Sequence, residues 1–306
     1  MSDSVTSQLF ISLLVILFGY FLKTVKLIRQ SDGEALARIV FNVTLPALII
    51  TTFSKVTIDY SLLSLSAFSL IYGCLMALLG ILFFQREARS TRGIMSMVLP
   101  GFNIGLFAYP LIEVIWGQEG ITYFGMFDIG NALVTFGLCY LLANHYSVAD
   151  SSLDVKTIFT RLSKSVPLMS YLAGFFIALL GITLPEPVVA FTGLIAKANG
   201  PLSLLLLGVY LSFSFSLSHI KQAGKVLAFR YVIGLAVGLA IFFIAPFGEL
   251  FKYTVLVGLI LPIATAVIPF AIEFHYDQKF VGAVANMTIV ISFALVWVIT
   301  GTSLIN

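Results

Sequence analysis

The sequence predicts an all-α polytopic membrane protein with about ten transmembrane helices in two inverted five-helix repeats. Three observations lead to this fold class. Of the 306 residues 59% are hydrophobic and 10% are charged, whereas a soluble domain has roughly 25% charged residues. The apolar residues form runs long enough to cross a bilayer, and the prolines of the first half recur in the second half at a nearly constant offset.

The apolar runs define the expected elements. A membrane helix needs roughly 20 mostly apolar residues. The first run is followed by KTVKLIRQSDG and not by a small-residue cleavage site, so we expect a retained helix and no signal peptide. The predicted spans lie near residues 8–28, 35–54, 61–84, 93–115, 120–144, 165–184, 187–216, 226–247, 253–273 and 280–302.

Basic residues gather in alternate joints between these spans. Because cytoplasmic loops accumulate Lys and Arg, we expect these joints in the cytoplasm, the protein in the cell membrane and both termini outside it. The opposite joints hold only Lys55, Lys197 and Lys252. The predicted cytoplasmic set has 14 of the 17 basic residues: Lys23, Lys26, Arg29, Arg38, Arg86, Arg89, Arg92, Lys156, Arg161, Lys164, Lys221, Lys225, Arg230 and Lys279.

An internal repeat relates the two halves. Each half has five predicted spans, and because five is odd the second copy enters the membrane from the opposite side, as in secondary transporters. We therefore divide the chain into a first repeat (1–146), a short cytoplasmic joint (147–162) and a second repeat (163–306). The matching pairs are Pro46 and Pro201, Pro100 and Pro262, Pro110 and Pro269, and Glu113 and Glu273, at offsets of 155, 162, 159 and 160 residues.

The segments LPGFNIGLFAYPLIE (99–113) and LPIATAVIPFAIE (261–273) break two predicted spans. Proline inside a helix removes a hydrogen bond and costs roughly 3 kcal/mol, and freed carbonyls, such as those of Leu106 and Thr265, need protein or water around them. Helices that start at such breaks direct N–H groups and positive dipole ends into the cavity, which suits an anion. Gly101 and Gly105 would let ligand and backbone approach, and Asn103 would offer both a donor and an acceptor.

These two segments resemble the fourth and ninth helices of the auxin efflux carrier family, which includes plant auxin carriers and bacterial malate and malonate permeases. FNVTLPALI and LIAKANGPLSLLLLGVYLS are similar to its second and seventh helices. The resemblance implies a scaffold of helices 1, 2, 6 and 7, a moving domain of helices 3–5 and 8–10, and elevator-type transport with substrate at the crossing of helices 4 and 9. The long regulatory loop of the plant carriers has no counterpart in the joint at 147–162.

Asp128 is the only carboxylate well inside a predicted span, so we expect it to face a partner or a wet cavity. It is the candidate for proton coupling, and a structural hydrogen bond between helices is the alternative. Asn131 lies three residues on, along the same helical face. Asn286 lies near the equivalent depth in the second half, which predicts a polar pair that faces the crossing from both sides.

Lys197 departs from the charge pattern, because it precedes the ANGP break on the outer side. It either attracts an anion or extends to the lipid headgroups. The residues expected at the substrate are Gly101, Asn103, Gly105, Pro110, Asp128, Asn131, Thr265, Pro269, Asn286 and Lys197.

The same residues bear on other functions. One intramembrane aspartate, no central histidine and no HExxH motif argue against a membrane protease, so we expect no enzyme. The three histidines lack ligand spacing, and the dispersed basic residues do not suit nucleic acid, so no metal, cofactor or nucleic acid is expected. The prediction is a secondary carrier of a small organic anion, such as a mono- or dicarboxylate, with proton coupling and a homodimer left open. The alternatives are a cation-coupled carrier of related fold and a membrane sensor or channel.

Overall fold

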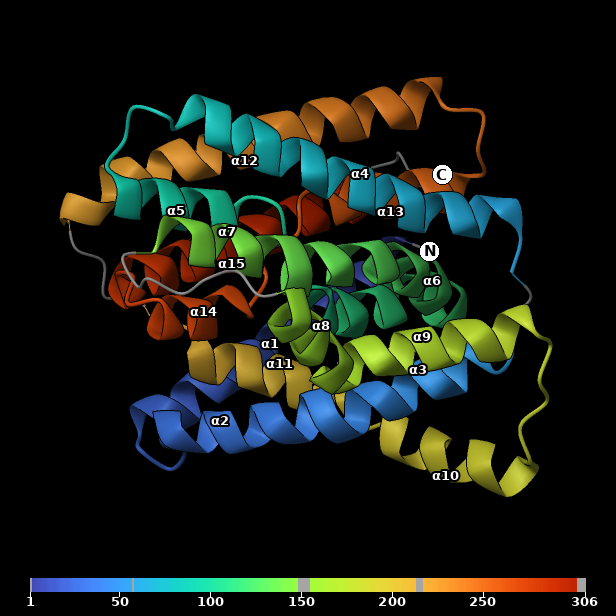
Figure 1. Cartoon of the computed structure of the whole chain (residues 1–306). Helices are drawn as coiled ribbons and strands as arrows, with labels where there is room; N and C mark the ends of the chain where they lie inside the picture. The colour runs from blue at the N-terminus through green and yellow to red at the C-terminus, as the bar shows by residue number, and fades with distance from the viewer. Residues whose placement is uncertain (1, 57, 148–154, 213–216, 302–306) are drawn as a thin grey trace.

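The computed structural model describes residues 2–56, 58–147, 155–212 and 217–301, which are almost entirely helical (Figure 1). Three π-helical segments, η1 (Val40–Thr44), η2 (Ile104–Ala108) and η3 (Leu133–Cys139), run directly into α3, α6 and α7. The α-helices are α1 (Ser2–Thr24), α2 (Gln30–Ile39), α3 (Leu45–Phe53), α4 (Tyr60–Phe83), α5 (Arg89–Val98), α6 (Tyr109–Ala132), α7 (Tyr140–Tyr146), α8 (Val155–Lys164), α9 (Val166–Leu179), α10 (Glu186–Ala196), α11 (Asn199–Tyr210), α12 (Leu217–Ile244), α13 (Glu249–Gly258), α14 (Val267–Glu273) and α15 (Gln278–Gly301).

Seven of the described helical stretches are long and apolar enough to cross a membrane, so the chain is a multi-span membrane protein. They are Val5–Thr24, Ser31–Phe53, Tyr60–Phe83, Ile104–Tyr146, Glu186–Tyr210, Gln222–Ile244 and Gln278–Gly301.

The difference from about ten predicted spans has a structural cause. The expected spans at 93–115 and 253–273 are divided into short helices by non-helical segments, and α9, in the expected span at 165–184, has 14 residues. The stretch Ile104–Tyr146 has 43 residues, about 65 Å of straight helix and roughly twice the apolar thickness of a bilayer. The chain departs from helical geometry inside it at Gly117 (φ 58°, ψ −146°), a conformation that glycine adopts without strain. The ten-span inverted repeat remains a prediction.

Two of the π-helical segments precede prolines. Pro46 is the second residue of α3 and follows η1, and Pro110 is the second residue of α6 and follows η2. Proline cannot donate to the carbonyl four residues back and clashes with it, and a π-bulge widens the helix at that point. Pro110 therefore lies within a continuous helical stretch, and the unwinding that we expected at this residue occurs earlier in the chain.

Small residues allow neighbouring helices to pack backbone against backbone. A Cβ atom on Gly19 of α1 would lie 2.2 Å from the carbonyl oxygen of Leu205 in α11, and one on Gly208 would lie 2.0 Å from that of Ile16. Without a hydrophobic force between helices in lipid, such close van der Waals packing is a principal source of association. The same close approach joins α6 to α4, where a Cβ on Gly130 would lie 2.1 Å from the carbonyl oxygen of Ser66.

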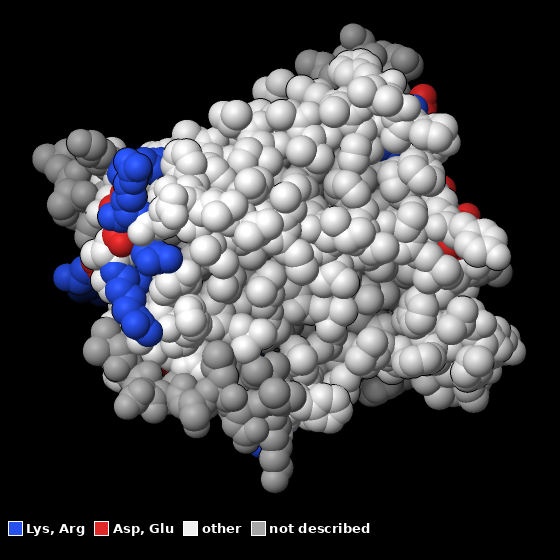
Figure 2. All heavy atoms as spheres, turned by 45° about the horizontal axis from the view of Figure 1, so that its top comes forward, with Lys and Arg blue, Asp and Glu red and all other residues white. Residues whose placement is uncertain are grey.

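Charge is distributed unevenly along the molecule. Figure 2 shows Lys and Arg side chains gathered at one end of the visible face, a wide uncharged band across its middle and a few acidic side chains at the other end. The start of α1 and the end of α15 lie toward the right of Figure 1, whereas α1 meets α2, and α4 meets α5, toward the left. We call the left end, where basic side chains gather in Figure 2, the basic end.

Candidate functional site

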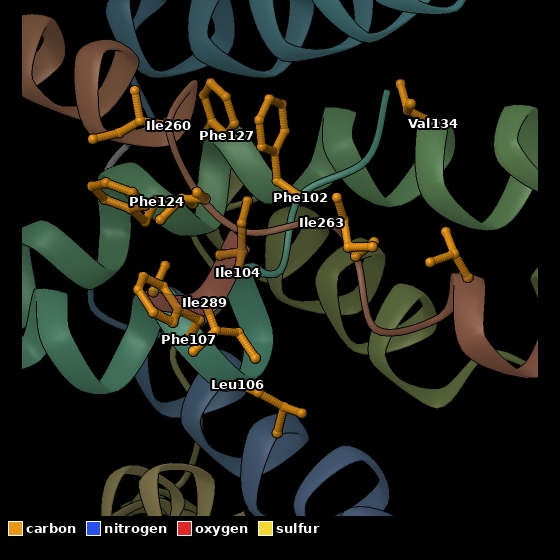
Figure 3. Close-up of a cluster of buried hydrophobic side chains, with 14 of the residues drawn as sticks. Phe102, Ile104, Leu106, Phe107, Phe124, Phe127, Val134, Ile260, Ile263 and Ile289 are labelled. Atoms are coloured by element: carbon orange, nitrogen blue, oxygen red, sulfur yellow. The ribbon is translucent and has the colours of Figure 1, made fainter. Parts of the chain in front are cut away.

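The two non-helical segments cross near the centre of the molecule. Residues 99–103 connect α5 to η2, and residues 259–266 connect α13 to α14. Phe102 and Ile263 form an isolated antiparallel bridge, and the backbone N–H of Asn103 donates to the carbonyl of Pro262 at 2.9 Å. Figure 3 shows the segment that carries Phe102 passing across the one that carries Ile263, with the labelled apolar side chains packed around them. We call this pair of segments the crossing.

Asn131 of α6 fixes the first segment of the crossing. Its Oδ1 accepts from the N–H of Phe102 at 2.9 Å, and its Nδ2 donates to the carbonyl of Phe102 at 3.1 Å. The side-chain amide therefore pairs with both backbone groups of one residue, as a neighbouring β-strand would do. Its Nδ2 also lies 2.8 Å from Oδ1 of Asp128, to which it donates.

The second segment is held by Thr288 of α15, whose Oγ1 accepts from the N–H of Ile263 at 3.3 Å. Asn286 was expected to oppose Asn131, but its Oδ1 accepts from the N–H of Ser212 and its Nδ2 donates to the carbonyl of Gly282. The second segment is therefore bonded by Thr288, which was not predicted, whereas Asn286, two residues earlier on α15, lines the cavity and bonds elsewhere.

The burial of Arg230 contradicts the prediction that this residue lies in a cytoplasmic joint. Because α12 begins at Leu217, Arg230 lies midway along this helix, with 1% of its surface exposed. Its guanidinium lies over the ring of Phe102, 4.4 Å from the centroid. The position of Arg230 inside the apolar run VLAFRYVIGLA was a signal for burial. It donates to the carbonyls of Leu99, Val98 (3.4 Å), Gly101 (2.9 Å), Leu261 (3.0 Å) and Pro262 (3.2 Å).

Asn103 begins the helical stretch that follows the first break. Its Oδ1 accepts from the N–H of Leu106 at 3.3 Å and so caps η2. Only 3% of Asn103 is exposed, and its Nδ2 has no hydrogen-bond partner among the described residues. An unpaired buried donor costs about 1–3 kcal/mol, so a group that accepts from this amide would be favoured there.

A cavity of about 1240 Å³ lies against the crossing. Seven residues that we predicted at the substrate line it: Asn103, Gly105, Asp128, Asn131, Thr265, Pro269 and Asn286.

The other three predicted site residues lie outside the lining. A Cβ on Gly101 would lie 2.6 Å from Oγ1 of Thr135, so the absence of a side chain at Gly101 accommodates protein and not ligand. Pro110 packs beside Gly200 at the start of α11. Lys197 is exposed at the end of α10.

The cavity opens toward the basic end. Several lining residues come from the helix ends there: Glu34, Arg38, Ser165, Ser212, Gln278 and Lys279. No lining residue in the described part of the chain comes from the joints at 54–59, 180–185 or 245–248, which lie at the other end. The cavity therefore extends from the crossing toward the basic end.

Asp128 lies in a buried network of polar side chains, with 6% of its surface exposed. Tyr171 of α9 donates to its Oδ2, and the hydroxyls of Tyr171 and Tyr109 lie 2.7 Å apart. Both carboxylate oxygens thus have a donor, one from Asn131 and one from Tyr171. Because Tyr109 belongs to the same helix as Asp128 and Tyr171 to another, the network links α6 to α9.

Comparison with known proteins identifies the chain. A family model described as a membrane transport protein matches residues 4–300. The chain belongs to this family, the auxin efflux carriers, as its motifs predicted. It is 28% identical to an uncharacterized transporter of Methanothermobacter thermautotrophicus over 287 residues, 92% of each chain. It is 22% identical to an uncharacterized transporter of Methanocaldococcus jannaschii over 306 residues, 97% of each chain.

For a membrane transport protein, the cavity has the features that a solute path requires. It extends from one end of the molecule to Asn103, beside helix breaks that supply further backbone groups. Among the described residues no three His, Cys, Asp or Glu side chains gather as a metal site would need.

Proposed function

We propose that this membrane transport protein is a secondary carrier of a small organic anion, a mono- or dicarboxylate, which binds in the cavity at the crossing. The observation that carries the proposal is Asn103, which lines the cavity and whose buried Nδ2 has no partner among the described residues. A carboxylate oxygen would accept from it and relieve the cost of the unpaired donor.

The polarity of the surrounding helix also favours an anion. Asn103 is the N-cap of the helical stretch formed by η2 and the first part of α6, so the positive dipole end of this stretch lies beside the amide. The cationic side chains of Arg38 and Lys279 line the same cavity, together with the anionic Glu34. Asp128 also lines the cavity, and both of its carboxylate oxygens already accept hydrogen bonds, from Asn131 and Tyr171.

The transport cycle that we propose is of the elevator type. Helices 3–5 and 8–10 of the predicted ten spans would carry the crossing across a scaffold of helices 1, 2, 6 and 7. The basic end would face the cytoplasm, because cytoplasmic joints accumulate Lys and Arg, and both termini would lie outside. The cavity of the present structure would then be open to the cytoplasm.

Uptake by proteoliposomes tests the substrate class and the position of the site together. The protein would be assayed by counterflow with malate, malonate and indole-3-acetate, each compared with its neutral amide. Asn103→Asp keeps the acceptor that caps η2 but replaces the free donor with a negative charge. We expect it to reduce anion counterflow at least tenfold, because like charges repel in a site of low dielectric.

Asn42→Asp is the matched control. Asn42 also lines the cavity, on η1, and its Nδ2 donates to the carbonyl of Arg38 at 2.9 Å. This variant adds the same charge to the same cavity away from the crossing, and we expect counterflow within about twofold of wild type, because water at this exposed position screens the charge. Equal counterflow by Asn103→Asp and wild type would refute the site, and carriage of the neutral amides in preference to the acids would refute the substrate class.

The proposed orientation has its own test. Cys74 is exposed on α4 and Cys139 is buried, so Cys74→Ser removes the accessible thiol. A cysteine appended after Asn306 in that background is expected to react with an impermeant maleimide in intact cells. Labelling only after lysis would place the C-terminus in the cytoplasm and the basic end outside, and so refute the proposed orientation.

A further inference from the structure

Arg230 is a buried cation without an anionic partner. It lies midway along α12, and in the part of the chain that the structure describes no carboxylate forms an ion pair with it. An unpaired charge at this depth in a membrane costs several kcal/mol, so its partners must compensate for the lost hydration.

The partners of Arg230 are backbone carbonyls of the crossing. They belong to the residues that follow α5 and α13 and to the last residue of α5, where helices leave acceptors unpaired and present the negative ends of their dipoles. One guanidinium, with five donors in a planar fork, satisfies acceptors from both halves of the chain. The carbonyls are those of Val98, Leu99, Gly101, Leu261 and Pro262.

This arrangement has two consequences for the cavity. The carbonyls that would repel an anion are directed toward Arg230. Phe102, whose ring lies 4.4 Å from the guanidinium carbon, is also a lining residue of the cavity, so the positive charge and the cavity share one neighbouring residue. The carbonyls carry only partial negative charges, whereas the guanidinium carries a full positive charge. In a medium of low dielectric the field of this charge is weakly screened and extends into the cavity.

We propose that Arg230 is the residue that makes the cavity selective for anions, through its charge, while its hydrogen bonds hold the two segments of the crossing together. This inference rests on the proposed function, because it assumes that the cavity receives the anionic substrate. It assigns the selectivity to a residue that lies behind the crossing and does not touch the substrate, so Arg230 is a positioning and specificity-determining residue.

Two substitutions separate its charge from its hydrogen bonds. Arg230→Lys keeps the charge but loses the planar fork, and Arg230→Met keeps the apolar stem and loses both. The matched control is Lys225→Met, because Lys225 lies on the same helix but is exposed at the surface, where it pairs with Glu87 at 2.7 Å. Each purified variant would be checked for a monodisperse folded state by size exclusion before binding is measured.

The measurement is the ratio of the dissociation constants of a neutral amide and the corresponding acid, by calorimetry. The pairs are malonamide and malonate, malamide and malate, and indole-3-acetamide and indole-3-acetate. For the pair with the tightest-binding acid, we expect wild type and Lys225→Met to prefer the acid at least tenfold. Arg230→Lys should bind both members more weakly but keep the preference. Arg230→Met should lose at least tenfold in the preference, whereas a purely structural residue would weaken both members equally.

The possible failures are distinct. Wild type that binds none of the acids, or prefers the amides, refutes the proposed function and this inference with it. Wild type that prefers the acid, with the same preference in folded Arg230→Met, refutes this inference alone. If Arg230→Met does not fold, Arg230→Gln replaces it, because the amide can still donate to the carbonyls without a charge. Loss of the preference in folded Arg230→Lys, in which the charge is retained, would also contradict the proposal.

Discussion

The two segments of the crossing contain corresponding prolines, but they are held in different ways. In the first segment, both backbone groups of Phe102 pair with the side chain of Asn131. In the second, the N–H of Ile263 pairs with Thr288 through one longer hydrogen bond of 3.3 Å. A helix break that recurs in both halves is therefore not accompanied by the same hydrogen-bond partners, because a different side chain bonds to the freed backbone in each half.

The asymmetry extends to the surroundings. Asn131 connects the first segment to Asp128 and, through it, to Tyr171. On the other side of the crossing, Ser292 lies 2.8 Å from the hydroxyl of Tyr231 and donates to the carbonyl of Ile260 at 2.6 Å, and Arg230 donates to the carbonyls of Leu261 and Pro262. The buried carboxylate beside the crossing therefore belongs to the first half, and the buried cation belongs to the second.

The largest effect is expected at Asn131. Asn131→Leu keeps the size of the side chain but leaves the N–H and the carbonyl of Phe102 unpaired in a buried place, and it removes a donor from Asp128. We expect a loss of about 2–4 kcal/mol in the free energy of unfolding and no measurable transport. Denaturant titration in detergent and counterflow measure the two effects. Wild-type stability would show that Asn131 does not hold the first segment.

Gly101→Ala tests the closeness of the two segments. The new Cβ would lie 2.6 Å from Oγ1 of Thr135 and 3.1 Å from Cβ of Ala264, which belongs to the second segment. We expect about 1–3 kcal/mol of destabilisation from this overpacking, measured as before. Gly224→Ala is the control, because a Cβ there meets nothing within 4 Å. Equal stability of the two variants would show that the segments tolerate separation.

Thr288→Val should have a smaller effect than Asn131→Leu. It removes the one hydrogen bond to Ile263 at nearly constant side-chain volume, so we expect a loss of about 1 kcal/mol and retained transport. The comparison of the two segments is wrong if Thr288→Val destabilises the protein as much as Asn131→Leu does.

Asp128→Asn should have the smallest effect on stability. A tyrosine hydroxyl both donates and accepts, so Tyr171 can accept from the new amide and donate to Tyr109, and we expect less than about 1 kcal/mol of destabilisation. If Asp128 carries the coupling proton, the variant will lose the dependence of transport on an imposed pH gradient but keep substrate exchange. Flux with and without the gradient, at matched protein level, measures this. Unaltered gradient dependence would leave Asp128 with a structural role.

The class of protein and its family could be predicted from local properties of the chain. Composition and the lengths of the apolar runs identify a multi-span membrane protein, because transfer into lipid depends on each segment by itself. The motifs around the broken spans predicted the family, which is confirmed. Seven of the ten residues predicted at the substrate line one cavity.

Other features depend on segments that are distant in sequence. The bonds between Asn131 and Phe102 join residues 29 positions apart, and those between Arg230 and Gly101 join residues 129 apart. The sequence by itself determined that the helices break at Pro100 and Pro262, because proline acts on its own turn of helix. Only the tertiary structure decided which side chains satisfy the freed backbone, and hence that Arg230 is buried, because those partners depend on which helix faces pack together.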